Sequence, residues 1–236
     1  MAIYRIAGVY VEMTPRYERL RSYSEKYLFE GDPPNEVLKV ELSDEYLKKR
    51  MADAPYLSPE DIEYIWLGAC FAHKMLEYRG FVLHSSAVAY ENKAYLFSAD
   101  SGTGKSTHTG FWRQCFGEEN TAIINDDKPL IREIDGVFYA AGTPFSGKSS
   151  LSENVTVPIK ALCFIHRSER DEIRRMTTGE ALEKMFDQML RPGGEESALM
   201  LLELLDGFLT KVPVYSLGVT FSPDSARFAY AELNKQ

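Results

Sequence analysis

Residues 98–110 read SADSGTGKSTHTG, and this stretch decides how the rest of the chain is interpreted. Within it, residues 99–106 have the form A-x-x-x-x-G-K-S, which is the Walker A (P-loop) pattern with Ala99 in place of the first glycine. Residues 94–100 (AYLFSAD) are predicted as a strand, and residues 107–116 continue as a predicted helix. A strand, a glycine-rich loop and a helix are the context that a phosphate-binding loop needs.

The chemistry of such a loop assigns a task to each position. Backbone N–H groups of residues 102–106 are expected to surround an anion at the positive end of the helix dipole. Gly102 and Gly104 can take positive φ, and Ala99 is acceptable if its φ is negative. Lys105 is expected at the β- and γ-phosphates, and the Ser106 hydroxyl at Mg²⁺. The nucleotide-binding candidates are Ser101, Gly102, Thr103, Gly104, Lys105, Ser106 and Thr107. The alternative is a glycine-rich turn that binds nothing.

Three polar residues could complete a reaction site. Asp126 and Asp127 follow an apolar strand at residues 121–125, and a carboxylate at such a strand end can hold Mg²⁺ beside a phosphate loop. His84 is assigned to the strand that precedes the loop. The alternatives are that Asn-Asp-Asp is only a turn and that His84 is structural.

A second Gly-Lys-Ser lies in GTPFSGKSS at residues 142–150. Thr143 and Pro144 stand near the position where a phosphate loop begins with Gly or Ala, so we reject it as a second nucleotide loop. Ser146 and Lys148 are predicted instead to contact the substrate. The alternative is a solvated loop.

The composition narrows the function classes. The chain has 236 residues and a net charge of −8, which argues against a general nucleic-acid binder. Its three cysteines lie far apart in the sequence, so neither a disulfide framework nor a zinc site is expected. We find no signal-peptide pattern and no long apolar run, and we therefore expect a cytoplasmic protein without a membrane partner.

The pattern along the chain predicts an α/β fold with an α+β tendency, built on a mixed-sheet core. An N-terminal α+β segment, residues 1–80, holds strands at 3–12 and 37–42 and a helix that Ser58 caps and Gly80 ends. The predicted core, residues 81–236, contains a hairpin that turns at Asp135-Gly136. Further core elements are expected at residues 81–90, 161–167, 179–190, 195–210, 212–217 and 222–235. The alternative is one continuous domain.

The combined motifs resemble the HPr kinase/phosphorylase family and, more remotely, the nucleotide-binding core of the phosphoenolpyruvate carboxykinases. His84, the loop at residues 100–106 and the pair Asp126-Asp127 carry this resemblance, which covers about residues 80–235. It implies a small stand-alone relative of the kinase, with the phosphate-loop core of that family. Its implied activity is ATP- and Mg²⁺-dependent transfer to a seryl-type hydroxyl of a small molecule, peptide or protein. The resemblance also makes a homo-oligomer possible.

The resemblance also implies roles for single residues. Asp126 would accept the hydroxyl proton and Asp127 would join Ser106 at the metal, although the two aspartates can exchange roles. His84 would orient an aspartate or bind a second metal. Arg167 is the first candidate for a contact to phosphate oxygens, ahead of Arg132 and Arg170. The phosphate donor could also be GTP or pyrophosphate.

Two other functions fit parts of the pattern. A nucleotide-binding switch or scaffold would use the same loop without transfer, but it needs no candidate base. A nucleoside or nucleotide kinase would have a parallel sheet and an arginine-rich lid. The dense strand-turn-strand pattern at residues 81–98 and 128–141 favours a mixed or antiparallel sheet instead.

Overall fold

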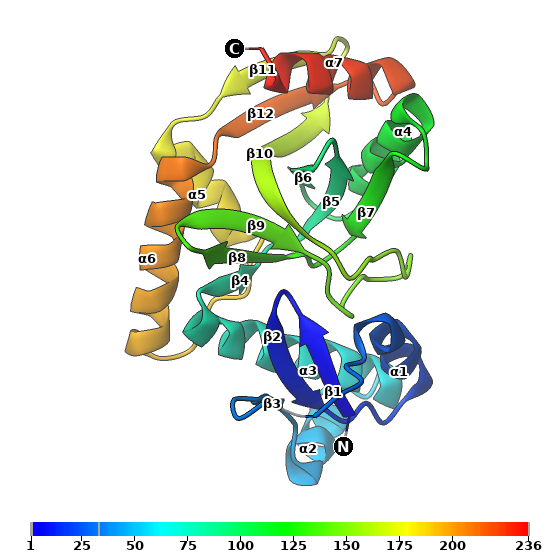
Figure 1. The fold of residues 1–236 in the computed structure, drawn as a ribbon, viewed down its shortest axis with the longest axis vertical. Helices are drawn as coiled ribbons and strands as arrows, with labels where there is room; N and C mark the ends of the chain where they lie inside the picture. Colours follow the sequence, from blue (N-terminus) through cyan, green and yellow to red (C-terminus); the bar gives the residue numbers. More distant parts are fainter. Residues whose placement is uncertain (1, 33, 236) are drawn as a thin grey trace.

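The structure is a computed structural model that describes residues 2–32 and 34–235. Figure 1 shows a small N-terminal part, drawn in blue and cyan, beneath a larger part built around a curled sheet. The α/β class with a mixed sheet is confirmed.

The large sheet has nine strands in the order β4-β8-β9-β10-β6-β5-β7, with β12 paired to β10 and β11 to β12. The bounds are β4 (Gly80–Val82), β5 (Ser85–Tyr90), β6 (Lys93–Ser98), β7 (Thr121–Asn125), β8 (Leu130–Ile134), β9 (Val137–Ala141), β10 (Thr156–Arg167), β11 (Glu172–Arg175) and β12 (Val214–Val219).

Strand β10 joins the two halves of this sheet. Its first residues, 156–158, pair antiparallel with β9, whereas residues 159–164 pair parallel with β6 and residues 162–167 parallel with β12. The remaining strand pairs of this sheet are antiparallel. This order contradicts the all-parallel sheet that an ordinary nucleoside or nucleotide kinase would have.

Helices cover both faces of the sheet beside the loop. Along β6, Ala94 and Leu96 enter one apolar cluster while Tyr95 and Phe97 enter another, as the two-residue period of a strand requires. The first cluster is closed by α5 (Thr178–Asp187) and α6 (Glu195–Lys211), and the second by α4 (Lys105–Phe116) and α7 (Pro223–Leu233). Strand β6 is therefore buried on both sides, which fixes the start of the loop that follows it.

The N-terminal part is a three-stranded sheet with helices packed on it. It contains β1 (Ala2–Ile6), β2 (Val9–Met13), α1 (Glu18–Ser24), η1 (Glu25–Tyr27), β3 (Leu38–Val40), α2 (Asp44–Asp53), α3 (Pro59–Lys74) and η2 (Met75–Tyr78). Leu130, Ala141 and Phe145 of the large part enter its apolar cluster, so the two parts share buried surface. The division at residue 80 stays a prediction.

Several local predictions hold. The Ser58 hydroxyl accepts from the Asp61 N–H and caps α3. Asp135 and Gly136 both have positive φ, as the two-residue hairpin turn between β8 and β9 requires.

Three local predictions are wrong. The strand predicted at residues 3–12 is a hairpin, because Ala7 and Gly8 turn with positive φ. Arg79, not Gly80, takes the left-handed conformation that ends the helical stretch, and Gly80 already belongs to β4. His84 lies in the bend between β4 and β5 and not within a strand.

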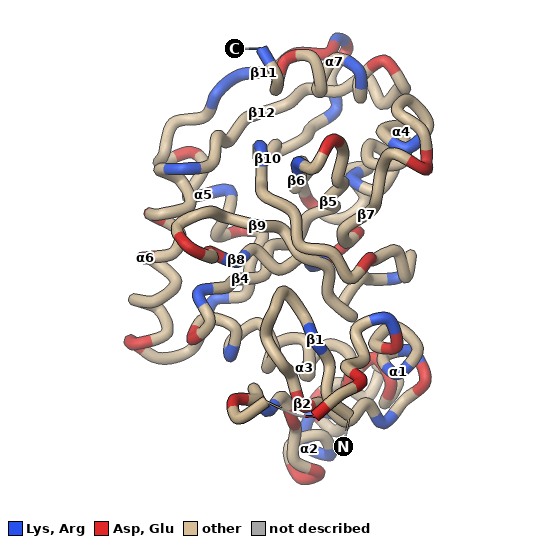
Figure 2. Tube along the Cα trace, in the orientation of Figure 1, with Lys and Arg blue, Asp and Glu red and all other residues tan. Residues whose placement is uncertain are grey.

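Charged residues of both signs are interspersed along the trace of both parts (Figure 2). Within residues 2–32 and 34–235, none of the helices combines the length and apolarity that crossing a bilayer requires.

Phe145 should carry much of the contact between the two parts. It is 2% exposed, and its ring lies 5.7 Å from Tyr64 and 5.5 Å from Phe71, both in α3. Phe145→Ala is expected to lower the free energy of unfolding in urea by about 3–5 kcal/mol, because it leaves a cavity in a packed cluster. Leu151→Ala, at an exposed side chain close by in the sequence, is the matched control and should stay within roughly 0.5 kcal/mol of the parent. An equal decrease in the free energy of unfolding in both variants would contradict this role of Phe145.

Candidate active site

The loop between β6 and α4 is shaped by its two glycines. Gly102 has φ +81° and Gly104 has φ +115°, as the sequence predicts. A Cβ at Gly104 would lie 2.3 Å from the Phe221 ring, so larger residues are excluded there. The buried Ala99 has no positive φ, which explains why alanine is tolerated at the first motif position. The first N–H groups of α4 have no partner within the helix and are free to bind an anion.

Lys105 lies inside the loop. It is 7% exposed, and its Nζ donates to the Ala99 carbonyl at 2.8 Å. Burial lowers the pKa of Lys105, and the charges of Asp127, Asp100 and Asp126 act against this shift. The ammonium group is therefore held by main-chain oxygens, close to three carboxylates, where phosphate oxygens are expected.

Asp126 is buried beside the start of α4. Its Oδ1 accepts from the Ser86 hydroxyl at 2.6 Å, and Ser86 in turn shares a hydrogen bond of 2.8 Å with Thr109 of α4. Within the described residues, its Oδ2 makes no hydrogen bond or ion pair. One carboxylate oxygen thus holds Asp126 in place while the other is available.

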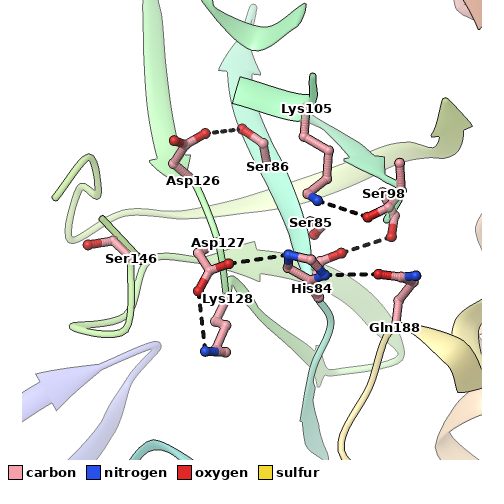
Figure 3. A network of polar contacts seen from close by, with 12 residues as sticks. His84, Ser85, Ser86, Ser98, Lys105, Asp126, Asp127, Lys128, Ser146 and Gln188 are labelled. Atoms are coloured by element: carbon pink, nitrogen blue, oxygen red, sulfur yellow. Dashed lines mark hydrogen bonds and ion pairs between the residues drawn. The ribbon is translucent and has the colours of Figure 1, made fainter. Parts of the chain in front are cut away.

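Asp127 belongs to a chain of polar contacts that returns to the loop (Figure 3). Its carboxylate lies 3.4 Å from His84 Nε2 and 3.2 Å from Lys128 Nζ. On its other side, His84 Nδ1 lies 2.9 Å from Gln188 Oε1, and Gln188 Nε2 donates to Asp100 at 2.9 Å. Burial acts to raise the pKa of Asp127, but the contacts with His84 and Lys128 outweigh it and hold the pKa below its usual value.

Residues 142–150 lie opposite the phosphate loop. Gly147 has φ +74°, and a Cβ there would lie 2.9 Å from the Asp127 Cβ, so this loop closes directly on the aspartate. The Gly147 N–H donates to the Tyr64 hydroxyl of α3 at 2.7 Å. The Ser146 hydroxyl is buried and has no hydrogen-bond partner in the described part of the chain. No helix follows this second Gly-Lys-Ser, in agreement with its rejection as a nucleotide loop.

A single cleft of about 420 Å³ joins these groups. It is lined by the predicted residues His84, Ser101, Gly102, Gly104, Lys105, Ser106, Thr107, Asp126, Asp127, Ser146 and Lys148. Thr103 lies instead at an adjoining hollow of about 370 Å³ behind the loop. The sequence motifs, which are dispersed over 65 positions, therefore converge on one place.

The predicted arginines do not line the cleft. Arg167 borders the hollow behind the loop, where its guanidinium group stacks 4.9 Å from the Phe221 ring centre. Arg132 donates to the carbonyls of Ala7 and Tyr78 and links the two parts of the chain. Arg170 pairs with the nearby Glu172. The structure thus brings none of the three to the phosphate loop's cleft.

Lys128, Gln188 and Tyr64 are among the contributing residues that were not predicted. Lys128 directly follows the aspartate pair, so its position next to the motif was an available signal. Gln188 lies at the end of α5 and Tyr64 lies in α3, and no local pattern marks them. They reach the site only through tertiary packing.

The oxygen-rich cleft fits Mg²⁺ better than a softer metal. Within the described ranges, no group of three or more His, Cys, Asp or Glu side chains could hold a metal by itself. Mg²⁺ binds through one or two carboxylates together with substrate phosphates and water. The exposed Ser106 hydroxyl, the Asp127 carboxylate and the unpartnered Ser146 hydroxyl are oxygen donors at the same cleft.

Comparison with known proteins adds little detail. No family model matches the sequence, and no curated protein matches it significantly. A solved structure described as the Hpr(Ser) kinase/phosphatase from Coxiella burnetii matches with a TM-score of 0.38 and 7% identity, over 65% of this chain and 99% of that chain. The roles proposed for individual residues rest on their geometry in this chain.

His108, on the core side of α4, should make the protein sensitive to acid. It is fully buried against Phe97 and Trp112, and burial lowers its pKa to about 4, with the charge of Asp171 opposing the shift. Because an unfolded histidine takes a proton below about pH 6.5, this residue should cost stability as the pH falls from 6.5 toward 4, by roughly 3 kcal/mol in total.

Urea unfolding at pH 7.5 and pH 4.5 measures this effect. His108→Gln keeps a hydrogen-bond acceptor for Trp112 and should lose less stability between the two pH values than the parent does. His73→Gln, at an exposed histidine of α3, is the control and should leave the difference unchanged. An unaltered pH dependence in His108→Gln would contradict the assignment.

Proposed function

We propose that this protein is an ATP-dependent kinase that transfers a phosphoryl group to the hydroxyl of an alcohol acceptor. One observation carries the proposal. A glycine-rich loop with a buried lysine shares one cleft with two carboxylates and a histidine. A module that only binds nucleotide does not need these additional groups.

The reaction needs in-line positioning and charge neutralisation more than covalent chemistry. The acceptor oxygen forms a bond to the γ-phosphorus, the bond from that phosphorus to the β-γ bridging oxygen breaks, and ADP leaves. Lys105 and the N–H groups at the start of α4 stabilise the charge on the transferring phosphoryl group. Mg²⁺, held by Ser106 and Asp127, supplies further neutralisation when it is bound.

Asp126 is the proposed proton acceptor. Its Oδ2 carries no contact within the described residues, whereas both oxygens of Asp127 are engaged by His84 and Lys128. The hydroxyl proton would therefore pass to Asp126, while His84 orients Asp127. Ser146 and Lys148, on the opposite loop, are placed to contact the acceptor or the transferred group.

Removing the lysine tests the nucleotide site. Lys105→Ala should weaken Mg·ATP binding by at least about 100-fold in calorimetry, because a charge-assisted contact to phosphate is lost. Lys93→Ala, at an exposed lysine of β6, is the control and should bind as the parent does. Undiminished affinity in Lys105→Ala would overturn the assignment of the loop.

Removing the proposed base separates transfer from binding. Asp126→Asn should slow phosphate transfer from labelled ATP to a panel of alcohols by roughly 10²–10⁴-fold, while ATP affinity changes little. Asp127→Asn should mainly raise the Mg²⁺ concentration needed for half-maximal rate. If these two effects are interchanged, the aspartates have exchanged roles. If the parent binds ATP and transfers phosphate to no alcohol, the alternative of a nucleotide-binding switch or scaffold is favoured.

A further inference from the structure

A second cavity opens beside the reaction cleft. It has a volume of about 260 Å³ and lies between α3 and residues 187–190, with Ile65, Ala69, Val82 and Leu190 among its walls. A narrower hollow of about 120 Å³ shares Ala69, Val82 and Leu190 with it and continues toward Leu76 and Phe81. Together they form one predominantly apolar groove, which we call the α3 groove.

Small residues on α3 explain why this groove exists. Ala69 and Ala72 lie on the helix face that lines it, between Ile65 at one end and Leu76, in η2, at the other. Their short side chains cannot fill the space to the opposite wall, which Met189 and Leu190 form. From residue 65 to residue 74, α3 advances about 14 Å at 1.5 Å per residue, and η2 extends this wall to Leu76, which gives the groove the length of a medium aliphatic chain.

One end of the α3 groove lies at the reacting groups. His84 lines both the groove and the cleft, and Lys128, which pairs with Asp127, lines the groove as well. Gln188, whose side chain contacts His84, directly precedes Met189 and Leu190 of the groove wall. A molecule in the groove would therefore reach the carboxylates of the cleft with the end that lies nearest His84.

The other end carries the positive charge of Arg191. Arg191 lines the narrow hollow, and no Asp or Glu does so among the described residues. Arg191 also has no carboxylate within ion-pair distance in residues 2–32 and 34–235. Leu190 at the rim is 57% exposed and Ile65 is 42% exposed, so apolar surface is open to solvent between the two ends. Apolar walls that end in a positive charge complement a chain that ends in an anion.

We propose that the acceptor is a medium-chain hydroxy acid. Its hydroxyl would pass His84 into the cleft and face Asp126, its aliphatic chain would lie along α3, and its carboxylate would meet Arg191. The proposal rests on the proposed kinase function, and it deepens that function by naming the substrate class. The transfer then yields the phosphate ester of the chain's hydroxyl together with ADP, and the hydroxyl proton passes to Asp126.

Binding without nucleotide tests the groove independently of catalysis. The probes are ω-hydroxy acids of about four to about ten carbons and the neutral alcohols of equal length. Calorimetry measures the affinity of each probe for the protein. Affinity should rise with chain length, by up to roughly threefold to fourfold per methylene until the groove is filled. At equal length, the hydroxy acid should bind more tightly than the neutral alcohol.

Two variants locate the binding. Ala69→Leu keeps a good helix former but fills the groove, so it should lower the affinity for the longest hydroxy acid by about tenfold. Ala52→Leu, at an exposed position of α2, is the matched control and should change nothing. Arg191→Gln should lower the affinity for the hydroxy acids and leave the affinity for the neutral alcohols unchanged. Circular dichroism verifies that the variants are folded.

The possible failures are distinguishable. If the hydroxy acids bind as described but receive no phosphate from Mg·ATP, the kinase function fails and the groove stands. If no chain binds, or if Ala69→Leu binds as the parent does, the groove assignment is overturned, even when another alcohol is phosphorylated. If Arg191→Gln lowers the affinity for acids and for alcohols equally, the proposed contact between Arg191 and the carboxylate is wrong.

Discussion

The candidate site depends on one buried side chain, Asn125, at the end of β7. Its amide oxygen accepts from the N–H groups of Asp127 and Lys128 at 2.9 and 2.7 Å, and its amide nitrogen donates to the carbonyl of Thr143 at 3.0 Å. A fully buried amide must satisfy its hydrogen-bonding groups, so the loss of these contacts would lower the free energy of unfolding. The same side chain therefore fixes the turn that carries the aspartates and the start of the loop that closes over them.

Around this fixed point, charges of both signs are balanced closely enough to be reorganised by a ligand. Lys105 is held by main-chain carbonyls, and Asp127 by two cationic groups. A bound polyphosphate would favour the charged form of Lys105 and so reverse the effect that burial has on its pKa. Lys105 would thus be the cation of the cleft on which the proposed binding of a nucleoside triphosphate depends most.

Local sequence patterns were sufficient for most of this arrangement. The loop, the aspartate pair and the hairpin at Asp135-Gly136 each depend on neighbouring residues, and residue type restricts backbone conformation at those positions. By contrast, the pairing of β10 with three partners depends on strands that are distant in the sequence. Gln188 and Tyr64 reach the site through tertiary packing, and Arg167 was misplaced because a basic residue after a strand does not reveal which side of the loop it reaches.

Residues 1–80 carry no recognisable motif, yet α3 contacts the site in two ways. Through Tyr64 it holds Gly147, the residue that packs directly against Asp127, and through its small residues it forms one wall of the α3 groove. The phosphate loop and the aspartates belong to the large sheet, so the proposed chemistry and the proposed acceptor recognition would be supplied by different segments. Because Phe145 packs between them, a shift of α3 would alter the groove and the loop over Asp127 together. Under the proposed function, acceptor binding and positioning of the Asp127 carboxylate would therefore depend on the same contacts between the N-terminal part and the core.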